Sequence, residues 1–236
     1  MRRLDGARQG GAEAPAWTAP ERGDRWATFD CYGTLIDWNG GIGRELERLF
    51  GAARGGELLH TYHDLEPQIQ REDPSRSYRD VMAVALARLG APAGEQDALG
   101  RSLPEWDPFP EVPAALEEAR DRGWRLAVLS NTDPDLLEAS LARIGVEFEL
   151  TVVASEIGSY KPAPTHWDEF FARSGADRAS HVHVAASLFH DIAPASTLGL
   201  RTIWINRLGE EAEPQPDVEL RSLAVLAESL DSLAPS

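Results

Sequence analysis

The stretch WATFDCYGTLIDW, residues 26–38, decides the fold. It opens with four apolar or strand-favouring residues, 26–29, which is the length of a short buried strand. This pattern ends at Asp30, and the small residues Gly33 and Thr34 follow where the chain must turn. Open α/β sheets bind ligands at the carboxyl ends of their strands. We therefore expect Asp30 at a ligand-binding edge, although a lone Asp after a strand more often only caps a turn.

Strand and helix patterns alternate along the second half of the chain. Apolar runs of strand length occupy residues 124–129, 151–154, 181–185 and 202–205, and helical patterns occupy 112–122, 134–144, 165–174, 194–198 and 218–233. Such alternation is typical of parallel sheets with right-handed crossovers. The sequence therefore predicts an α/β fold with a doubly wound, Rossmann-like parallel sheet.

The segment before residue 110 has no strand pattern after the opening stretch. Its apolar residues recur at helical spacing, most clearly over residues 78–89. We predict an all-helical cap domain over 40–106, inserted into a core made of 25–39 and 107–236. Residues 1–24 are rich in Gly, Ala and Pro and are predicted to form a mobile leader.

Composition limits the partners of the protein. The net charge of −16 disfavours nucleic acid, which is itself a polyanion. No apolar run approaches the roughly 18 residues that a membrane span needs. The single cysteine, Cys31, cannot form an intramolecular disulfide, which fits a reducing cytoplasm. We expect a cytoplasmic protein that acts on a small anionic substrate, and the sequence leaves open whether it forms a homodimer.

Polar residues follow four of the predicted strands or the loops after them. They are Asp30 with Thr34, Ser130 with Asn131, Lys161, and Asp191. Each has an ordinary explanation as a turn, cap or surface residue. A parallel sheet, however, places the carboxyl ends of its strands on one edge, so their occurrence together predicts a shared site. A carboxylate beside an ammonium group and hydroxyl donors is a positioned nucleophile, and a second acid can direct water.

In order and spacing, these residues resemble the four motifs of the haloacid dehalogenase superfamily, over about residues 26–207. The string DCYGTL matches the pattern D-x-[DY]-G-T-[LI] of its first motif. The resemblance implies that Asp30 attacks the substrate and forms an aspartyl ester. Ser130, with Asn131 beside it, would bind the anionic group of the substrate, Lys161 would neutralise charge, and Asp191 would direct the water that cleaves the ester. The helical segment would be the cap that closes over this site.

Two positions point to one branch of that superfamily. Its phosphatases usually have a second Asp two residues after the nucleophile, where this chain has Tyr32, and a phenol is a poor acid near neutral pH. They also hold Mg²⁺ with a carboxylate near the position of Ala186. The DCYGTL form of the first motif and the segment Trp204-Ile205-Asn206-Arg207 resemble the L-2-haloacid dehalogenases, and this resemblance implies that no cofactor is needed. If the chain is instead a Mg²⁺-dependent phosphatase, Asp30 and Asp191 are the expected metal ligands.

The resemblance to the dehalogenases is incomplete. Their early cap Arg has no counterpart near His63, Trp167 takes the place of a Tyr, and Ala186 and Leu188 replace a Ser and an Asn. The residues expected to contact the substrate are Tyr32, Thr34, Ser130, Asn131, Trp167 and His190. Three hypotheses remain open: a metal-independent hydrolase of (S)-2-haloacids, a Mg²⁺-dependent phosphatase of a small metabolite, and a relative that binds a metabolite or partner without turnover.

Overall fold

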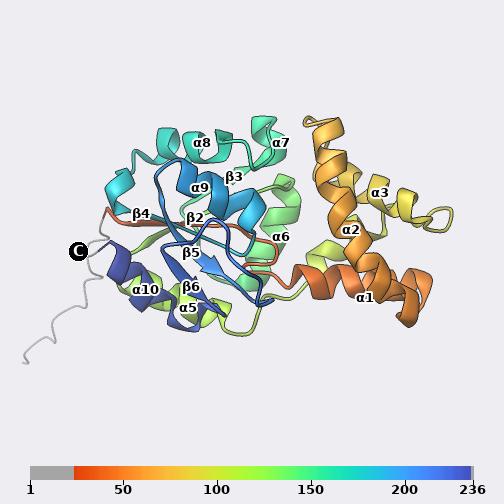
Figure 1. Cartoon of the computed structure of the whole chain (residues 1–236), viewed down its shortest axis with the longest axis horizontal. Coiled ribbons are helices and arrows are strands. Elements are labelled where there is room, and N and C mark those ends of the chain that lie inside the picture. Colours follow the sequence, from red (N-terminus) through yellow and green to blue (C-terminus); the bar gives the residue numbers. More distant parts are fainter. Residues whose placement is uncertain (1–23, 235–236) are drawn as a thin grey trace, which may run out of the picture.

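The computed structural model describes residues 24–234, and these contain a six-stranded parallel sheet in the order β3-β2-β1-β4-β5-β6 (Figure 1). The strands are β1 Trp26–Phe29, β2 Arg125–Ser130, β3 Leu150–Val153, β4 His181–Ala185, β5 Arg201–Ile205 and β6 Val218–Leu220. The predicted α/β class and doubly wound parallel sheet are confirmed. The chain reverses its direction of travel through the sheet between β1 and β4, which is the point where such folds bind ligands.

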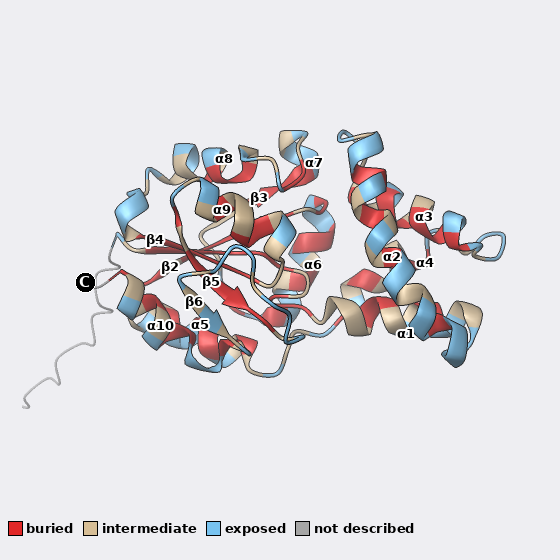
Figure 2. Cartoon of the chain, in the orientation of Figure 1, coloured by how far each residue is buried: buried red, intermediate tan, exposed pale blue. Residues whose placement is uncertain are grey.

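Helices cover both faces of the sheet. They are α5 Val112–Asp121, α6 Pro134–Ile144, α7 Ala154–Ile157, α8 Thr165–Ser174, α9 Ala193–Thr197 and α10 Leu226–Leu233. In Figure 1, α5 and α10 lie on one face while α8 and α9 lie on the other. The buried strands and the inward helix sides form the core (Figure 2).

One predicted helix is partly wrong. Residues 218–233 were expected to be helical throughout, but Val218–Leu220 form strand β6, paired with Ile203–Ile205 of β5. Three residues are too few to show a strand pattern, and pairing with a neighbouring strand decides their conformation.

The segment between β1 and α5 contains helices and no strand of the sheet. Its elements are α1 Trp38–Phe50, α2 Ala52–Glu72, α3 Tyr78–Leu89, α4 Ala98–Ser102 and the 3₁₀ turn η1 Leu103–Glu105. Two of these helices begin at a residue whose side chain caps the helix. Asp37 accepts a hydrogen bond from the backbone N–H of Gly40 at the start of α1, and Ser77 accepts one from the backbone N–H of Asp80 at the start of α3. Figure 1 shows α1, α2 and α3 grouped beside the sheet. We call α1–α4 the cap.

The two connections of the cap run side by side. The backbone N–H of Asp37 donates to the carbonyl of Asp107 at 2.9 Å, and that of Phe109 donates to the carbonyl of Leu35 at 3.0 Å. The predicted domain boundaries at 39/40 and 106/107 stay predictions. The predicted leader, residues 1–24, lies outside the described residues apart from Asp24. Within residues 24–234, no helix has the length and apolar character needed to cross a membrane.

Candidate active site

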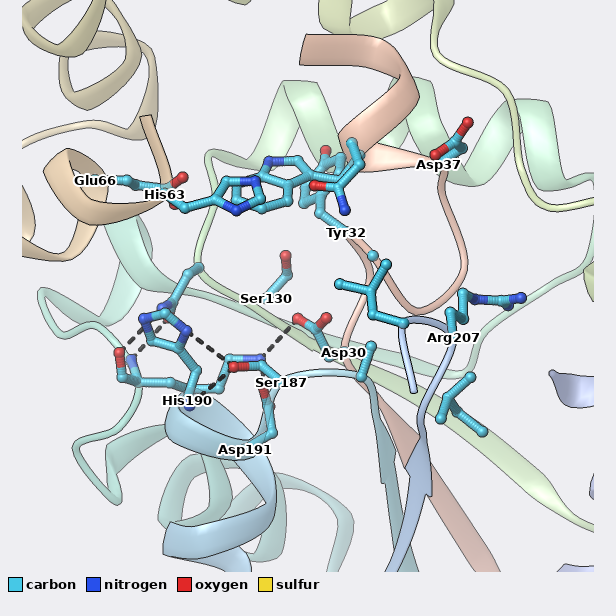
Figure 3. A pocket seen from close by; sticks show the side chains of 18 of the residues that line it. Asp30, Tyr32, Asp37, His63, Glu66, Ser130, Ser187, His190, Asp191 and Arg207 are labelled. Atoms are coloured by element: carbon cyan, nitrogen blue, oxygen red, sulfur yellow. Dashed lines mark hydrogen bonds and ion pairs between the residues drawn. The ribbon is translucent and has the colours of Figure 1, made fainter. Parts of the chain in front are cut away.

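A cavity of about 400 Å³ lies between the carboxyl ends of the strands and the cap. This is a usual size for a small-molecule site. Core residues that line it include Asp30, Tyr32, Ser130, Asn131, Lys161, His190 and Asp191, and cap residues include Trp38, His63, Glu66 and Tyr78. Figure 3 shows His63 and Glu66 on the opposite side of this cavity from Asp30, Ser130 and Asp191.

Asp30 follows β1 directly and is held from both sides. Its Oδ2 accepts a hydrogen bond from Thr34 Oγ1 at 2.9 Å, and its Oδ1 accepts one from Lys161 Nζ at 2.9 Å. Gly33 makes the turn between them possible, because its φ of +89° is a conformation that favours glycine. Burial raises the pKa of Asp30, while the Lys161 ammonium favours the ionised form. The carboxylate is thus fixed in orientation at the cavity floor.

Lys161 connects the two acids of the site. Its side chain is buried, and Nζ donates to Asp30 Oδ1 at 2.9 Å, to Asp191 Oδ1 at 2.7 Å and to the Leu129 carbonyl at 2.7 Å. Burial by itself would lower the pKa of Lys161, but the two carboxylates raise it above its ordinary value. All three ammonium protons have acceptors, so this cation is stable away from water.

Asp191 lies in a short π-helical turn, Leu188–Ile192, after β4. Its Oδ1 accepts from Lys161 and also from His183 Nε2 at 3.0 Å, whereas its buried Oδ2 has no hydrogen-bond partner among the described residues. Burial alone would raise the pKa of Asp191, but the charge of Lys161 and the hydrogen bond from His183 outweigh burial and lower it. Asp191 is therefore ionised, with one oxygen left to face a ligand.

Other expected site residues have mixed placements. Ser130 Oγ is buried, lines the cavity and has no partner in the described chain. The Tyr32 hydroxyl is hydrogen-bonded to Ser140 Oγ at 3.1 Å, as the donor when the Ser140 hydroxyl donates to the Leu136 carbonyl, and burial raises the pKa of Tyr32 far above its ordinary value. His190 lines the cavity, and burial lowers its pKa to about 4, so its ring is neutral at pH 7.

Two of the expected substrate contacts, Trp167 and Thr34, do not line the cavity, and a third, Asn131, lines it with its side chain bonded to the backbone. Trp167 is fully buried against β-sheet residues, with its ring centroid 5.3 Å from that of His183, and it does not line the cavity. The reason is that this face of α8 packs on the sheet. Thr34 is fully buried and orients Asp30. The side-chain amide of Asn131 bonds the backbone of Lys161, donating to its carbonyl at 3.1 Å and accepting from its N–H at 2.7 Å. These last two residues position the two charged groups.

Two residues of the site were missed by sequence reasoning. His183 alternates with apolar residues in β4, where nothing marked it as a partner of Asp191. Glu66 stands in the apolar stripe of α2, four residues after Tyr62 and three before Ile69, and its side chain lines the cavity. A charged residue at helical spacing within an apolar stripe was the available signal for Glu66.

The side chains at this edge of the sheet offer few oxygen ligands for magnesium. Mg²⁺ requires several oxygen ligands in near-octahedral geometry. Asp30 and Asp191 are both paired with Lys161, and Ala186 offers no side-chain oxygen. Across residues 24–234, no group of three or more His, Cys, Asp or Glu side chains is arranged to hold a metal ion.

Comparisons with known proteins find dehalogenases and a phosphatase among the similar chains. The chain is 30% identical over 219 residues to an (S)-2-haloacid dehalogenase of Pseudomonas sp. (strain YL), which covers 87% of this chain and 94% of that protein. It is 31% identical over 140 residues to a phosphoserine phosphatase of Thermus thermophilus, which covers only 57% of this chain and 56% of that protein. A crystal structure of an L-2-haloacid dehalogenase superposes with a TM-score of 0.79 at 27% identity, covering 88% of this chain and 98% of that chain.

The match to a protein family covers most of the chain. The model of the haloacid dehalogenase-like hydrolases matches residues 25–199, which include all four polar positions at the carboxyl edge of the sheet. The chain therefore belongs to the haloacid dehalogenase-like hydrolases.

Proposed function

We propose that this protein hydrolyses the carbon–halogen bond of a short (S)-2-haloacid through an ester on Asp30. The observation that carries the proposal is the position of Lys161 Nζ, 2.9 Å from Asp30 Oδ1 and 2.7 Å from Asp191 Oδ1. One buried ammonium favours the ionised form of two carboxyls, one suited to attack and one suited to direct water. The similarity to (S)-2-haloacid dehalogenases supports this substrate class.

The first half-reaction uses the lower part of the cavity. The Asp30 carboxylate attacks carbon 2 of the substrate, the carbon–halogen bond breaks, and the halide leaves with the bonding electrons. Ser130 Oγ has no partner among the described side chains, so it can donate to the substrate carboxylate. A departing halide needs no proton, which suits a site where Tyr32 is held by Ser140 and has a pKa too high to act as an acid.

The second half-reaction returns Asp30 to its starting state. A water molecule attacks the carbonyl carbon of the ester, and the bond between this carbon and the ester oxygen breaks, so that the ester oxygen takes one proton of the water and leaves as the hydroxyl of the product. Asp191 Oδ2 is free to accept a hydrogen bond from this water and to take its other proton, which then passes to solvent. The products are a 2-hydroxy acid, halide and a proton, so the oxygen of the new hydroxyl comes from Asp30 and solvent oxygen replaces it.

A paired assay tests this function. Halide release is measured with 2-haloacids of two to four carbons, and phosphate release with a panel of phosphorylated metabolites, each with added Mg²⁺ and with EDTA. We expect halide release that survives EDTA, because Asp30 and Asp191 are committed to Lys161. Phosphate release that disappears with EDTA and returns with Mg²⁺ would support the phosphatase hypothesis in its place. The absence of both activities would support a relative that binds without turnover.

A further inference from the structure

The cap side of the cavity has an acidic rather than a basic lining. Glu66 in α2 is 7% exposed, lines the cavity, and keeps Oε2 without a hydrogen-bond partner in the described residues. Its other oxygen, Oε1, accepts from Gln70 at 3.1 Å. No Lys or Arg of the cap helices lines this cavity. A buried, unpartnered carboxyl oxygen is costly unless a ligand meets it.

Aromatic side chains surround this carboxyl group. Trp38 and Tyr78 line the same cavity and are joined by a 3.1 Å hydrogen bond from the indole N–H to the phenol. The Trp38 ring also stacks on His63 with centroids 4.8 Å apart and meets Tyr62 edge-on at 6.1 Å. A carboxylate beside aromatic faces is the combination that binds organic ammonium groups.

The opposite end of the cavity offers a hydrogen-bond donor. The Lys161 ammonium there is shared by Asp30 and Asp191, whereas Ser130 Oγ has no partner among the described residues and can donate to an anionic group. The cavity is therefore complementary to a molecule with a negative end toward the sheet and a positive end toward the cap.

We propose that Glu66 and the aromatic side chains around it bind an ammonium group, so that the substrate is a short acid carrying an ammonium at the end remote from its carboxylate. This inference rests on the proposed function only for the end of the substrate that meets Asp30. The proposal explains why an acidic residue, Glu66, lines the cap side of a cavity whose other side can bind an anionic group.

The protonation of Glu66 gives the binding a defined dependence on pH. Burial raises the pKa of Glu66 to about 8, and the negative charge of Asp30 adds to this, while Tyr78, Gln70 and Tyr62 favour the carboxylate. Glu66 is thus protonated at pH 7 in the free protein. An ammonium ligand favours the carboxylate, so binding below pH 8 must release a proton, and affinity must rise with pH up to about 8.

Binding of inert probes tests the proposal without relying on turnover. The probes are ω-amino acids from 3-aminopropanoate to 6-aminohexanoate, each paired with the alkanoate in which a methyl replaces the ammonium, butanoate to heptanoate. Calorimetry measures affinity and proton release. We expect at least one ω-amino acid to bind tenfold or more tightly than its partner, with proton release below pH 8.

Variants of α2 complete the test. Glu66→Gln should remove the tenfold preference and the proton release, while Glu57→Gln, at an exposed position of the same helix, should leave both unchanged. Equal binding of paired probes by the wild type, or binding of neither, overturns the proposal whether or not Glu66→Gln folds. The proposal is also overturned if folded Glu66→Gln still prefers the ω-amino acid. It is equally overturned if this variant loses affinity for the ω-amino acid and for the paired alkanoate to the same extent. None of these measurements depends on halide release. A failure of the proposed function would appear in the halide assay alone, and a failure of this proposal would appear in the binding measurements alone.

Discussion

His183 Nε2 lies 3.0 Å from Asp191 Oδ1, and its Nδ1 lies 2.8 Å from Thr28 Oγ1, which is itself 2.8 Å from His181 Nε2. One consistent assignment of protons makes His181 donate to Thr28, Thr28 donate to His183, and His183 donate to Asp191. This buried chain fixes the His183 tautomer and holds the oxygen of Asp191 that does not face the cavity. His183 thereby positions Asp191.

Replacing His183 tests this positioning role. His183→Phe removes the donor to a buried carboxylate, a hydrogen bond worth roughly 1.5–3 kcal/mol, so we expect ester hydrolysis to slow about ten- to a hundredfold. Ester formation should change less, because Asp30 does not contact His183. Rapid-quench measurement of the two steps checks this. His183→Gln, which keeps a donor, should recover part of the rate, and equal slowing of both steps would indicate a general structural defect.

Asp30→Asn should abolish turnover, because a neutral amide cannot act as the carboxylate nucleophile. In the wild type, a single turnover in ¹⁸O-water should place the label in Asp30, since hydrolysis of the ester returns a solvent oxygen to the enzyme. Mass spectrometry of the peptide that contains Asp30 measures this. Asp168→Asn, at an exposed position of α8, is the control. Label found only in the product would mean that water attacks the substrate directly.

Asp191→Asn should let the covalent adduct accumulate. Water attack on the ester needs an acceptor, and the free Oδ2 of Asp191 is positioned to provide one. Ester formation should persist, so intact-protein mass spectrometry should show a shift equal to the retained group. A carboxyalkyl mass would identify a haloacid substrate, and a phosphoryl mass would identify a phosphate ester. Inactive, folded protein without an adduct at saturating substrate would argue against this division of roles.

Lys161→Met should destabilise the fold in a pH-dependent way. Removing the ammonium leaves two buried carboxyls without a counter-charge, a loss of roughly 3–5 kcal/mol at neutral pH. Without Lys161, burial and mutual repulsion raise the folded-state pKa of Asp30 and Asp191. A carboxyl group whose pKa is raised in the folded state destabilises the fold at pH values where the group is ionised. This destabilisation disappears as the pH falls and the group becomes protonated. The deficit should therefore shrink as pH falls below about 5.

Urea unfolding of the wild type and Lys161→Met at pH 7.5 and pH 4.5 measures this deficit. The stability that the wild type gains from the lowered pKa of Asp191 is lost only below the unfolded pKa of about 3.9, so it is largely retained at pH 4.5, and the curves approach each other because the carboxyls of Lys161→Met become protonated. The double variant Lys161→Met, Asp191→Asn should be more stable at neutral pH than Lys161→Met alone. If Lys161→Met loses the same amount of stability at both pH values, the loss comes from changed packing and not from the missing charge.

The sheet and its polar edge were predictable because local sequence carries both signals. Short apolar runs that end in Asp30, Ser130 and the segment before Asp191 mark strands and the ends where their side chains emerge. The parallel arrangement then brings these ends together without any long-range detail.

Contacts that depend on packing were not predictable in the same way. Trp167 matched a substrate-binding position by spacing, but the face of α8 that meets the sheet is decided by the whole helix, and this buries the ring. Glu66 lines the cavity and His183 bonds Asp191 only because segments distant in the sequence come together around them. Burial of a titratable group is a tertiary property, and a single residue in a sequence carries little sign of it.

The adjacent connections of the cap, where Asp37 bonds Asp107 and Leu35 bonds Phe109, have a consequence for how such enzymes diversify. The chain leaves the core and re-enters it at neighbouring points, so the intervening helices form a loop whose ends are already closed. Lengthening a loop of this kind adds little entropic cost, since the cost grows only with the logarithm of its length. Cap helices can be exchanged, extended or shortened while Asp30 keeps its place, and selectivity can change independently of the reaction.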